Sequence, residues 1–291
     1  MFCRNGKYFI LIFVFLVIFF GFRHNLFLGD YMKFNVGDYV TRNSYNNDIV
    51  FVILSIDEGE IILKGVSVRL IANSPIDDLI KYDAGIDDDF GKRVIIESPF
   101  TENNRCEFFY LPAKVLHLDG DGDYLKKCLE FYKNNRIMAF GKVISEENMY
   151  KDVLGYLREY KPDILVITGH DAYVKKNDNI NDLINYKNTL NFIKTVKEAR
   201  KYEKSHEKLV IIAGACQSDY EELIKSGADF ASSPKRVNIH ALDPAIIATA
   251  VSLTEKNKEI NIVELLEKTK YGKDGMGGLK VNGLMYVGYP R

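Results

Sequence analysis

From residue 114 onward, short apolar runs alternate with longer segments whose apolar residues recur every three or four positions. The runs have the length and β-branched content of buried strands, and they include KVLHLD, DILVITG and KLVIIAGA. The segments between them, such as DYLKKCLEFYKNN, place apolar residues on one helical face. At least four such alternations predict an α/β domain over residues 113–291, with a mostly parallel sheet flanked by helices.

The N-terminal part of the chain has a different pattern. Between residues 34 and 74, short β-rich runs are separated by turn residues such as YNN and DEG. This spacing predicts a small SH3-like β-barrel over residues 32–75. Residues 76–112 are charged, are interrupted by Gly and Pro, and lack a hydrophobic period, which predicts a linker.

An apolar run at residues 8–22 precedes this barrel and follows two basic residues, Arg4 and Lys7. Its fifteen residues are fewer than the roughly 20 that a membrane-spanning helix needs. The run therefore fits a signal peptide or a short anchor. Met32 begins a stretch typical of the start of a domain, so a start codon assigned too far upstream is an alternative origin for residues 1–31.

Composition and charge exclude several kinds of partner and site but leave the predicted fold unchanged. Hydrophobic residues make up 47% of the chain and charged residues 27%, as in ordinary globular proteins. The net charge of -1 gives no indication of a nucleic-acid partner. The four cysteines lack the paired spacing of a zinc site or of a dense disulfide framework, which favours a reducing compartment.

A thiol and an imidazole follow two of the predicted buried strands. Cys216 comes after LVIIAGA, and His170 comes after DILVITG. The carboxyl ends of parallel strands gather at one edge of a sheet, so these side chains are candidates for a nucleophile and its base. The position of Cys216 ahead of a helix near Asp219 favours the thiolate form. The alternatives are a cysteine with a packing role only, and His117 or His240 as the base.

In such a pair the histidine takes the thiol proton and later protonates the leaving amine. The backbone N–H of Cys216 and one from the turn at Asp171 are candidates for the oxyanion hole. Asp171 is also a candidate for orienting the ring of His170. This chemistry requires no metal ion and no organic cofactor.

Three aspartates alternate with glycines in HLDGDGDYL, directly after another predicted strand. Asp119 and Asp121 are candidates for an acidic pocket that binds arginine, because a carboxylate binds a guanidinium group in a bidentate manner. A second interpretation is a solvated turn in which Asp121 or Asp123 caps the next helix. A third is a metal loop, although Tyr124 stands at the sixth position counted from Asp119, where a calcium loop requires glycine.

Several of these motifs together resemble the YabG family of sporulation-specific cysteine peptidases. The resemblance rests on KVLHLDGDGDYLKKCL, YKPDILVITGHDAY, IIAGACQS and FASSPKRVNIHALDP, with MKFNVGDYVTRNSY resembling the start of the family. It implies a caspase-like logic, in which one strand ends at the histidine and the next ends at the cysteine. It maps the general base to His170 and the nucleophile to Cys216. It also implies processing of spore coat and related proteins near arginine, which favours the pocket interpretation of Asp119 and Asp121.

The resemblance places the expected enzyme in the cytoplasm, in the developing spore or in its coat, and at a membrane only if residues 8–22 act as an anchor. Self-cleavage in the linker near Arg93 or Arg105 is a further hypothesis. Two other functions stay open as alternatives. One is a non-catalytic binding protein in coat assembly, and the other is a metal-dependent hydrolase that uses Asp119.

Overall fold

The computed structural model describes residues 34–57, 60–86, 89–98, 107–174, 176 and 182–289. The chain falls into two units: the first is Met1–Val66 with Ile71–Gly85, and the second is Ser67–Leu70 with Ile86–Arg291. The extension expected at residues 1–31 lies outside the described residues. In the part of the chain that is described, no helix is long and apolar enough to cross a membrane.

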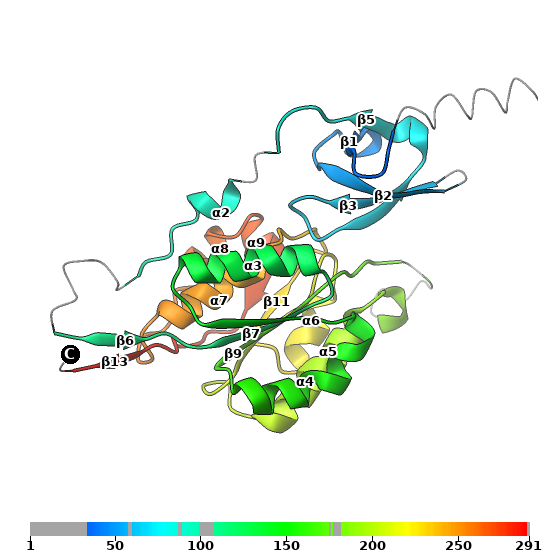
Figure 1. Ribbon diagram of the computed structural model, residues 1–291. Coiled ribbons are helices and arrows are strands. Elements are labelled where there is room, and N and C mark those ends of the chain that lie inside the picture. The colour runs from blue at the N-terminus through cyan, green and yellow to red at the C-terminus, as the bar shows by residue number, and fades with distance from the viewer. Residues whose placement is uncertain are drawn as a thin grey trace, which may run out of the picture. The chain divides into compact units, whose positions relative to one another are not determined.

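The first unit contains, in its described residues, one antiparallel sheet of five strands in the order β4-β3-β2-β1-β5 (Figure 1). Alternate strand residues are buried, among them Phe51 with Ile53 and Ile61 with Leu63. This period of two is expected when one face of a sheet is buried. The elements are β1 Tyr39–Arg42, β2 Phe51–Asp57, β3 Glu60–Gly65, β4 Ile71–Ser74 and β5 Leu79–Lys81, with 3₁₀ turns η1 Asn43–Tyr45 and η2 Ile76–Asp78.

A six-stranded sheet forms the centre of the second unit, in the order β12-β11-β10-β9-β7-β8. All neighbouring strands run parallel except β11 and β12. The strands are β7 Val115–Asp119, β8 Ala139–Val143, β9 Ile164–Thr168, β10 Val210–Ala213, β11 Phe230–Ser232 and β12 Met276–Gly278. The predicted α/β class with a mostly parallel sheet is confirmed.

Helices cover both faces of this sheet (Figure 1). One face carries α3 Gly122–Asn134 and α7 Asp243–Leu253, and the other carries α4 Glu146–Tyr160, α5 Thr189–Tyr202 and α6 Tyr220–Lys225. Alternate residues of β7 and β9, such as Leu118 and Ile167, pack against the second layer. Because both faces are covered, the central strands are continuous apolar runs. The remaining helical elements of this unit are α2 Phe90–Arg93, η4 Leu183–Asn185, α8 Ile262–Glu267 and α9 Gly272–Gly275.

The helix α7 is apolar around its whole circumference and lies buried. Ile246 and Ile247 point to different sides of the helix, and both are 0% exposed. Pro244 stands in its first turn, where the missing N–H of proline costs no helical hydrogen bond. The sequence NIHALDPAIIATAVSLT predicts a helix with a break before Pro244, and in the structure this break is the start of the helix.

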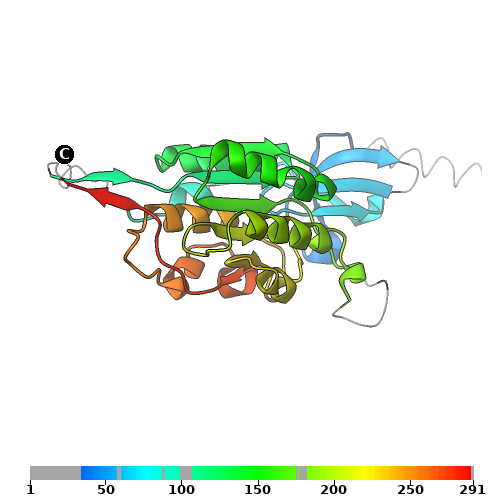
Figure 2. The ribbon, with the colours of Figure 1, turned by 90° about the horizontal axis from the view of Figure 1, so that it is seen from below.

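The glycine-containing stretch GGLKVNGLMYVGYP predicts a hairpin near the C-terminus, and this prediction is wrong. Its two halves, β12 and β13 Tyr286–Gly288, pair with different partners: β12 with β11, and β13 with β6 Phe109–Leu111 (Figure 2). β12 completes an edge of the large sheet, whereas β13 and β6 form a separate ribbon that extends away from it. Both partners lie far away along the chain, so local turn signals did not reveal the pairing.

Part of the segment predicted as a linker, residues 76–112, has regular structure. β5 pairs with β1, with Lys81 opposite Val40, and the first unit continues to Gly85. The elements α2 and β6 also fall in this segment and belong to the second unit. The charged stretch with its Gly and Pro residues therefore contains short elements joined by turns. Such residues are common in the turns that connect strands.

Asp229, just before β11, is fully buried and accepts hydrogen bonds from Arg200 Nη2 at 2.7 Å and from the N–H of Ile211 at 2.6 Å. We expect Asp229→Ala to lower the free energy of unfolding by about 3–5 kcal/mol, because the guanidinium of Arg200 loses its charged partner. Urea unfolding followed by circular dichroism measures this change. Glu198→Ala, which removes the partner of the exposed Lys201, should change stability by less than about 0.5 kcal/mol, and equal losses would contradict the prediction.

Candidate active site

The carboxyl ends of β9 and β10 bring His170 and Cys216 to the same edge of the sheet. The two strands pair in parallel with Ile167 opposite Ala213, and each candidate follows its member of this pair by three residues. The pairing continues past the strands, since the N–H of Gly214 donates to the carbonyl oxygen of Ile167 at 3.0 Å. The two loops that carry the thiol and the imidazole therefore start side by side.

His170 is held at its ring, its amide and its carbonyl group. Its Nε2 lies 3.0 Å from Asp121 Oδ2, its N–H donates to Glu146 Oε1 at 2.7 Å, and its carbonyl oxygen accepts from Asn188 Nδ2 at 2.8 Å. Its Nδ1 is buried and has no hydrogen-bond partner among the described residues. A carboxylate at Nε2 favours a proton on that nitrogen, which leaves Nδ1 as an acceptor. An acceptor of this kind has the chemistry of a general base.

Two glycines make room for the carboxylate of Glu146. A Cβ atom at Gly120 or at Gly169 would lie 2.3 Å from Glu146 Oε1. Glu146 is the first residue of α4, so its carboxylate also lies at the positive end of that helix. The glycine before His170 thus has a packing reason: it lets Glu146 reach the histidine amide.

Asp171 joins the histidine loop to the cysteine loop. Its carboxylate accepts from Ser218 Oγ at 2.8 Å and from two groups at the start of α5. Ser218 Oγ in turn accepts from the N–H of Ala215 at 3.0 Å, so both loops share one hydrogen-bonded network. The carboxylate that contacts the ring of His170 is that of Asp121, and Asp171 acts on the loops instead.

Cys216 is fully buried in this structure. The N–H of Ile239 donates to its sulfur at 3.2 Å, and Gly214 with a φ of 108° turns the chain out of the strand. Burial raises the pKa of Cys216 to about 12, so the sulfur is a protonated thiol at neutral pH. The thiolate form expected from the helix that follows is not favoured here, because loss of hydration is the largest influence on the pKa of this buried thiol.

Asp119 is buried and forms an ion pair with Arg69, which belongs to the same unit. Arg69 Nη1 lies 2.8 Å from Asp119 Oδ2, and both side chains are 0% exposed. Arg69 Nη2 donates to the carbonyl oxygen of Ala241 at 3.1 Å. Burial is the largest influence and raises the pKa of Asp119, but the charge of Arg69, the neighbouring His117 and the N–H of Asp121 together outweigh it and hold that pKa at about 2. The carboxylate therefore already binds one guanidinium group.

Asp121 caps α3, as one of the alternatives predicted. Its Oδ1 accepts from the N–H groups of Asp123 at 2.9 Å and Tyr124 at 3.3 Å, while Oδ2 contacts His170. A role for Asp119 and Asp121 in binding a substrate arginine stays a prediction. Within the described residues, no group of three or more His, Cys, Asp or Glu side chains is placed to hold a metal ion.

Tyr124 on α3 lies beside His170. Its ring centroid is 5.7 Å from that of His170, and its hydroxyl group donates to the carbonyl oxygen of Val68 at 2.8 Å. Burial raises the pKa of Tyr124, with smaller contributions from nearby groups that include Asp121 and Cys216. The hydroxyl group is therefore neutral and acts as a hydrogen-bond donor.

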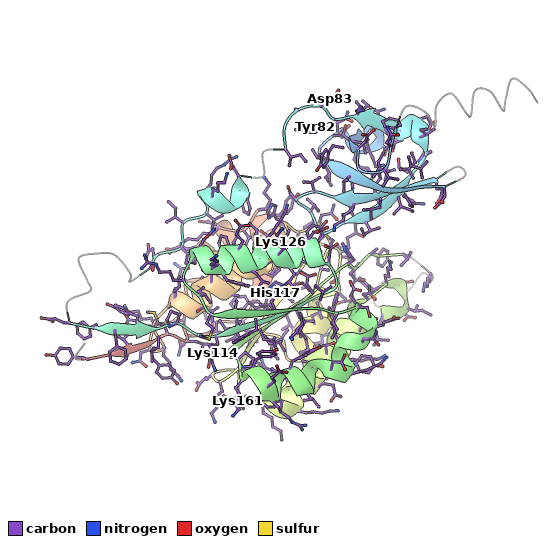
Figure 3. The ribbon with its side chains drawn as sticks, in the orientation of Figure 1. Tyr82, Asp83, Lys114, His117, Lys126 and Lys161 are labelled. Atoms are coloured by element: carbon purple, nitrogen blue, oxygen red, sulfur yellow. The ribbon has the colours of Figure 1, made fainter. Side chains whose placement is uncertain are left out.

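The two other histidines that competed for the role of base have structural contacts. His117 lies in the core on β7 (Figure 3), with Nδ1 3.1 Å from Tyr132 Oη and Nε2 2.8 Å from Thr168 Oγ1. Burial lowers the pKa of His117, so its ring is neutral. The Nδ1 of His240 accepts the backbone N–H two residues further on, at 3.1 Å.

Sequence analysis missed three residues of this site: Arg69, Glu146 and Tyr124. Arg69 lies in the β-rich run SVRLIA, where its only signal is a single arginine among apolar residues. Glu146 was visible only as an acidic residue in the first turn of a helix. Tyr124 was visible only as part of the apolar face of α3.

Comparison with known proteins identifies the class as a peptidase. The family model described as YabG peptidase U57 matches residues 35–95 and 91–290, and the chain belongs to this family. Among curated proteins, the sporulation-specific protease YabG of Bacillus subtilis (strain 168) is 40% identical over 287 residues, which cover 89% of this chain and 99% of that protein. No solved structure matches. The family places the chain among peptidases of sporulation, whose substrates are proteins.

Asp119 should make stability depend on pH in the acid range. Its pKa of about 2 lies below the ordinary value of 3.8, so its ion pair stabilises fully above about pH 4, and this stabilisation is lost as the pH falls through about 2. We expect Asp119→Asn to remove about 2 kcal/mol of this pH dependence and to be less stable at pH 7, where Arg69 keeps an unpaired buried charge.

Urea unfolding at a series of pH values between 7 and about 2.5 measures both effects. Asp152→Asn, which removes an exposed charge from α4, is the control and should retain the dependence of the unmodified chain. An Asp119→Asn variant with an unchanged dependence on pH would show that this carboxylate is not ion-paired in solution.

Proposed function

We propose that the chain is a cysteine endopeptidase that acts in sporulation through a thioester on Cys216, with His170 as general base and then acid. The observation that carries this proposal is the equal offset of the two residues on adjacent parallel strands. The hydrogen bond between Asp171 and Ser218, which ties the two loops together, supports it further. The match to a peptidase family supports a hydrolytic reaction.

In the proposed reaction, His170 Nδ1 takes the proton of Cys216 while the sulfur attacks the scissile carbonyl carbon. The N–H groups of Cys216 and Asp171 stabilise the oxyanion, and breaking of the C–N bond is coupled to proton transfer from the imidazolium to the leaving amine. Water, deprotonated by the same imidazole, then hydrolyses the thioester. No metal ion or organic cofactor enters this sequence. Because Cys216 is a buried thiol, its deprotonation must accompany the attack or follow exposure of the sulfur.

The preference for arginine is assigned to the acidic residues Asp119 and Asp121. Asp119 supports this assignment because it already holds a guanidinium group in a site without water access. Asp121 stands two residues further on, adds negative charge at the same rim, and contacts His170 with one carboxylate oxygen. A single loop would then select the substrate side chain and orient the base.

The finer fold and biological assignments follow from this reaction class. The second unit is proposed to be caspase-like, and the first to be an SH3-like docking module. Spore coat and related proteins are the proposed substrates, in the developing spore, its coat or the cytoplasm. Self-cleavage is proposed near Arg93, which is exposed at the end of α2, or near Arg105, which lies outside the described residues. Residues 8–22 also lie outside the described residues. The chain is proposed to associate with a membrane only if these residues act as an anchor.

Replacement of the proposed nucleophile or base should abolish cleavage. We expect Cys216→Ala and His170→Ala to lower kcat/KM for a peptide with a single arginine by at least about 10³-fold, because each removes a group that reacts with the substrate. Mass spectrometry of the products maps the cut. His206→Ala, a partly exposed histidine outside this site, is the control and should retain cleavage.

Two outcomes would replace this proposal. Cleavage that requires Mg²⁺ and survives Cys216→Ala would favour a metal-dependent hydrolase that uses Asp119. Coat proteins that bind to the chain but are cut by none of its forms would favour the binding protein.

Asp121→Asn separates the capping role of this residue from its contact with His170. Asparagine caps helices about as well as aspartate, so the melting temperature should stay nearly unchanged. We expect kcat to fall by about 10²-fold or more, because the amide no longer favours the Nε2–H form of the imidazole. Steady-state kinetics measures this loss against Asp123→Asn, an exposed position in the first turn of the same helix. Equal kcat values in the two variants would remove Asp121 from the mechanism.

A further inference from the structure

The segment Ser67–Leu70 connects β3 to β4 along the chain, yet it belongs to the second unit. We propose that this segment occupies the substrate-binding cleft of the peptidase as an arginine-containing peptide would, so that the enzyme holds Arg69 in its own specificity pocket. The inference rests on the proposed function, and it describes how the chain regulates that site. Three sets of contacts support it.

The first set is made by the main chain. Val68 forms an antiparallel bridge with His240, the N–H of Arg69 donates to the carbonyl oxygen of Ile239 at 3.1 Å, and the N–H of Ala241 donates to the carbonyl oxygen of Ser67 at 2.8 Å. The segment thus pairs with the chain that follows β11 through one isolated antiparallel bridge, and it turns tightly at Arg69, since the N–H of Leu70 donates to the carbonyl oxygen of Val68 at 2.8 Å. Addition of a strand to an open edge is a common way in which proteins bind peptides, because main-chain hydrogen bonds accept any sequence.

The second set is made by the side chain of Arg69. Its guanidinium group lies against Asp119, with Nη1–O distances of 2.8 Å to Oδ2 and 3.0 Å to Oδ1, and its Nη2 donates to Ala241. Its carbon Cζ lies 5.2 Å from the centroid of the Tyr124 ring. A buried carboxylate, a carbonyl oxygen and an aromatic face together recognise the charge, the donors and the flat surface of a guanidinium group. These are the features by which a pocket would select arginine.

The third set links the segment to the residues of the reaction. Ile239 accepts the N–H of Arg69 through its carbonyl oxygen and donates its own N–H to the sulfur of Cys216 at 3.2 Å. Tyr124 donates to the carbonyl oxygen of Val68, and its ring lies beside that of His170. One residue thus contacts both the segment and the nucleophile, and another contacts both the segment and the base.

A segment in this position competes with substrate. The apparent affinity for an added peptide equals the affinity of the open cleft multiplied by the fraction of molecules in which the cleft is open. Removal of the Arg69 side chain should therefore increase binding of an arginine peptide. A purely structural role for the ion pair gives the opposite expectation, since loss of Arg69 would then only disorder the pocket.

The test measures binding in a chain that cannot cut. Fluorescein-labelled Ser-Val-Arg-Leu is titrated, with anisotropy as readout, into Cys216→Ala and into Arg69→Ala combined with Cys216→Ala. We expect the combined variant to bind at least about 10-fold more tightly, and the further change Asp119→Asn to abolish the gain. Arg200→Ala in the same background is the matched control, because it also removes an arginine from an ion pair with a buried aspartate, and it should show no gain. Equal affinities with and without Arg69 would overturn the inference.

A second measurement needs no change at Arg69 and so decides the question even if that variant fails to fold. Hydrogen exchange is followed in Cys216→Ala at saturating concentrations of the unlabelled peptide. We expect the amide of Arg69 to lose protection as the segment leaves, while the amide of Ala241 stays protected because the peptide replaces Ser67 as its acceptor. Protection of the Arg69 amide that does not change at any peptide concentration would overturn the inference.

The outcome can be separated from that of the proposed function. Peptide binding that increases on loss of Arg69, in a chain whose Cys216 proves not to be catalytic, would keep the cleft and reject the cysteine mechanism. Cleavage that depends on Cys216, together with unchanged peptide binding in the Arg69 variant, would support the cysteine mechanism. It would reject the inference that Ser67–Leu70 occupies the substrate-binding cleft.

Discussion

The parallel hydrogen bonding between β9 and β10 is the constraint on which the rest of this structure depends. It fixes Ile167 opposite Ala213, and from that pair the chain needs only three more residues to reach His170 on one strand and Cys216 on the other. Parallel strands must be covered on both faces, and the helices that cover them bring Glu146 and Tyr124 to the same rim. A shift of the register by one residue would move both loops and every contact that joins them.

Four acidic side chains meet at this rim, and each has a different partner. Asp119 holds a guanidinium group, Asp121 holds an imidazole and a helix start, Glu146 holds a main-chain amide, and Asp171 joins two loops. Buried carboxylates are costly unless they are paired in this way, so these partners explain how so much negative charge is tolerated beside a thiol. Burial is the main reason why the thiol of Cys216 stays protonated, and the negative charge of Asp171 adds a smaller contribution in the same direction.

Much of this architecture could be predicted from the sequence, because each strand and helix leaves its own local pattern of apolar residues. The apolar runs gave β7, β9 and β10, and helical periodicity placed Tyr124 and Cys128 on the buried face of α3. The positions of His170 and Cys216 at strand ends followed from the same runs. The contact of Arg69 with Asp119 did not, because fifty residues separate them and the arginine lies in a stretch that favours a strand. The partners of β12 and β13 escaped prediction for the same reason: pairing over long separations leaves no local pattern.

The last part of the chain supplies what completes the second unit. α7 covers one face of the sheet, β12 closes its edge, and β13 pairs with β6, which comes more than 150 residues earlier. While a nascent chain is still attached to the ribosome, these pieces are missing and the apolar surface of the central strands stays open. The second unit can therefore complete its sheet and cover its central strands only after these late residues have emerged from the ribosome.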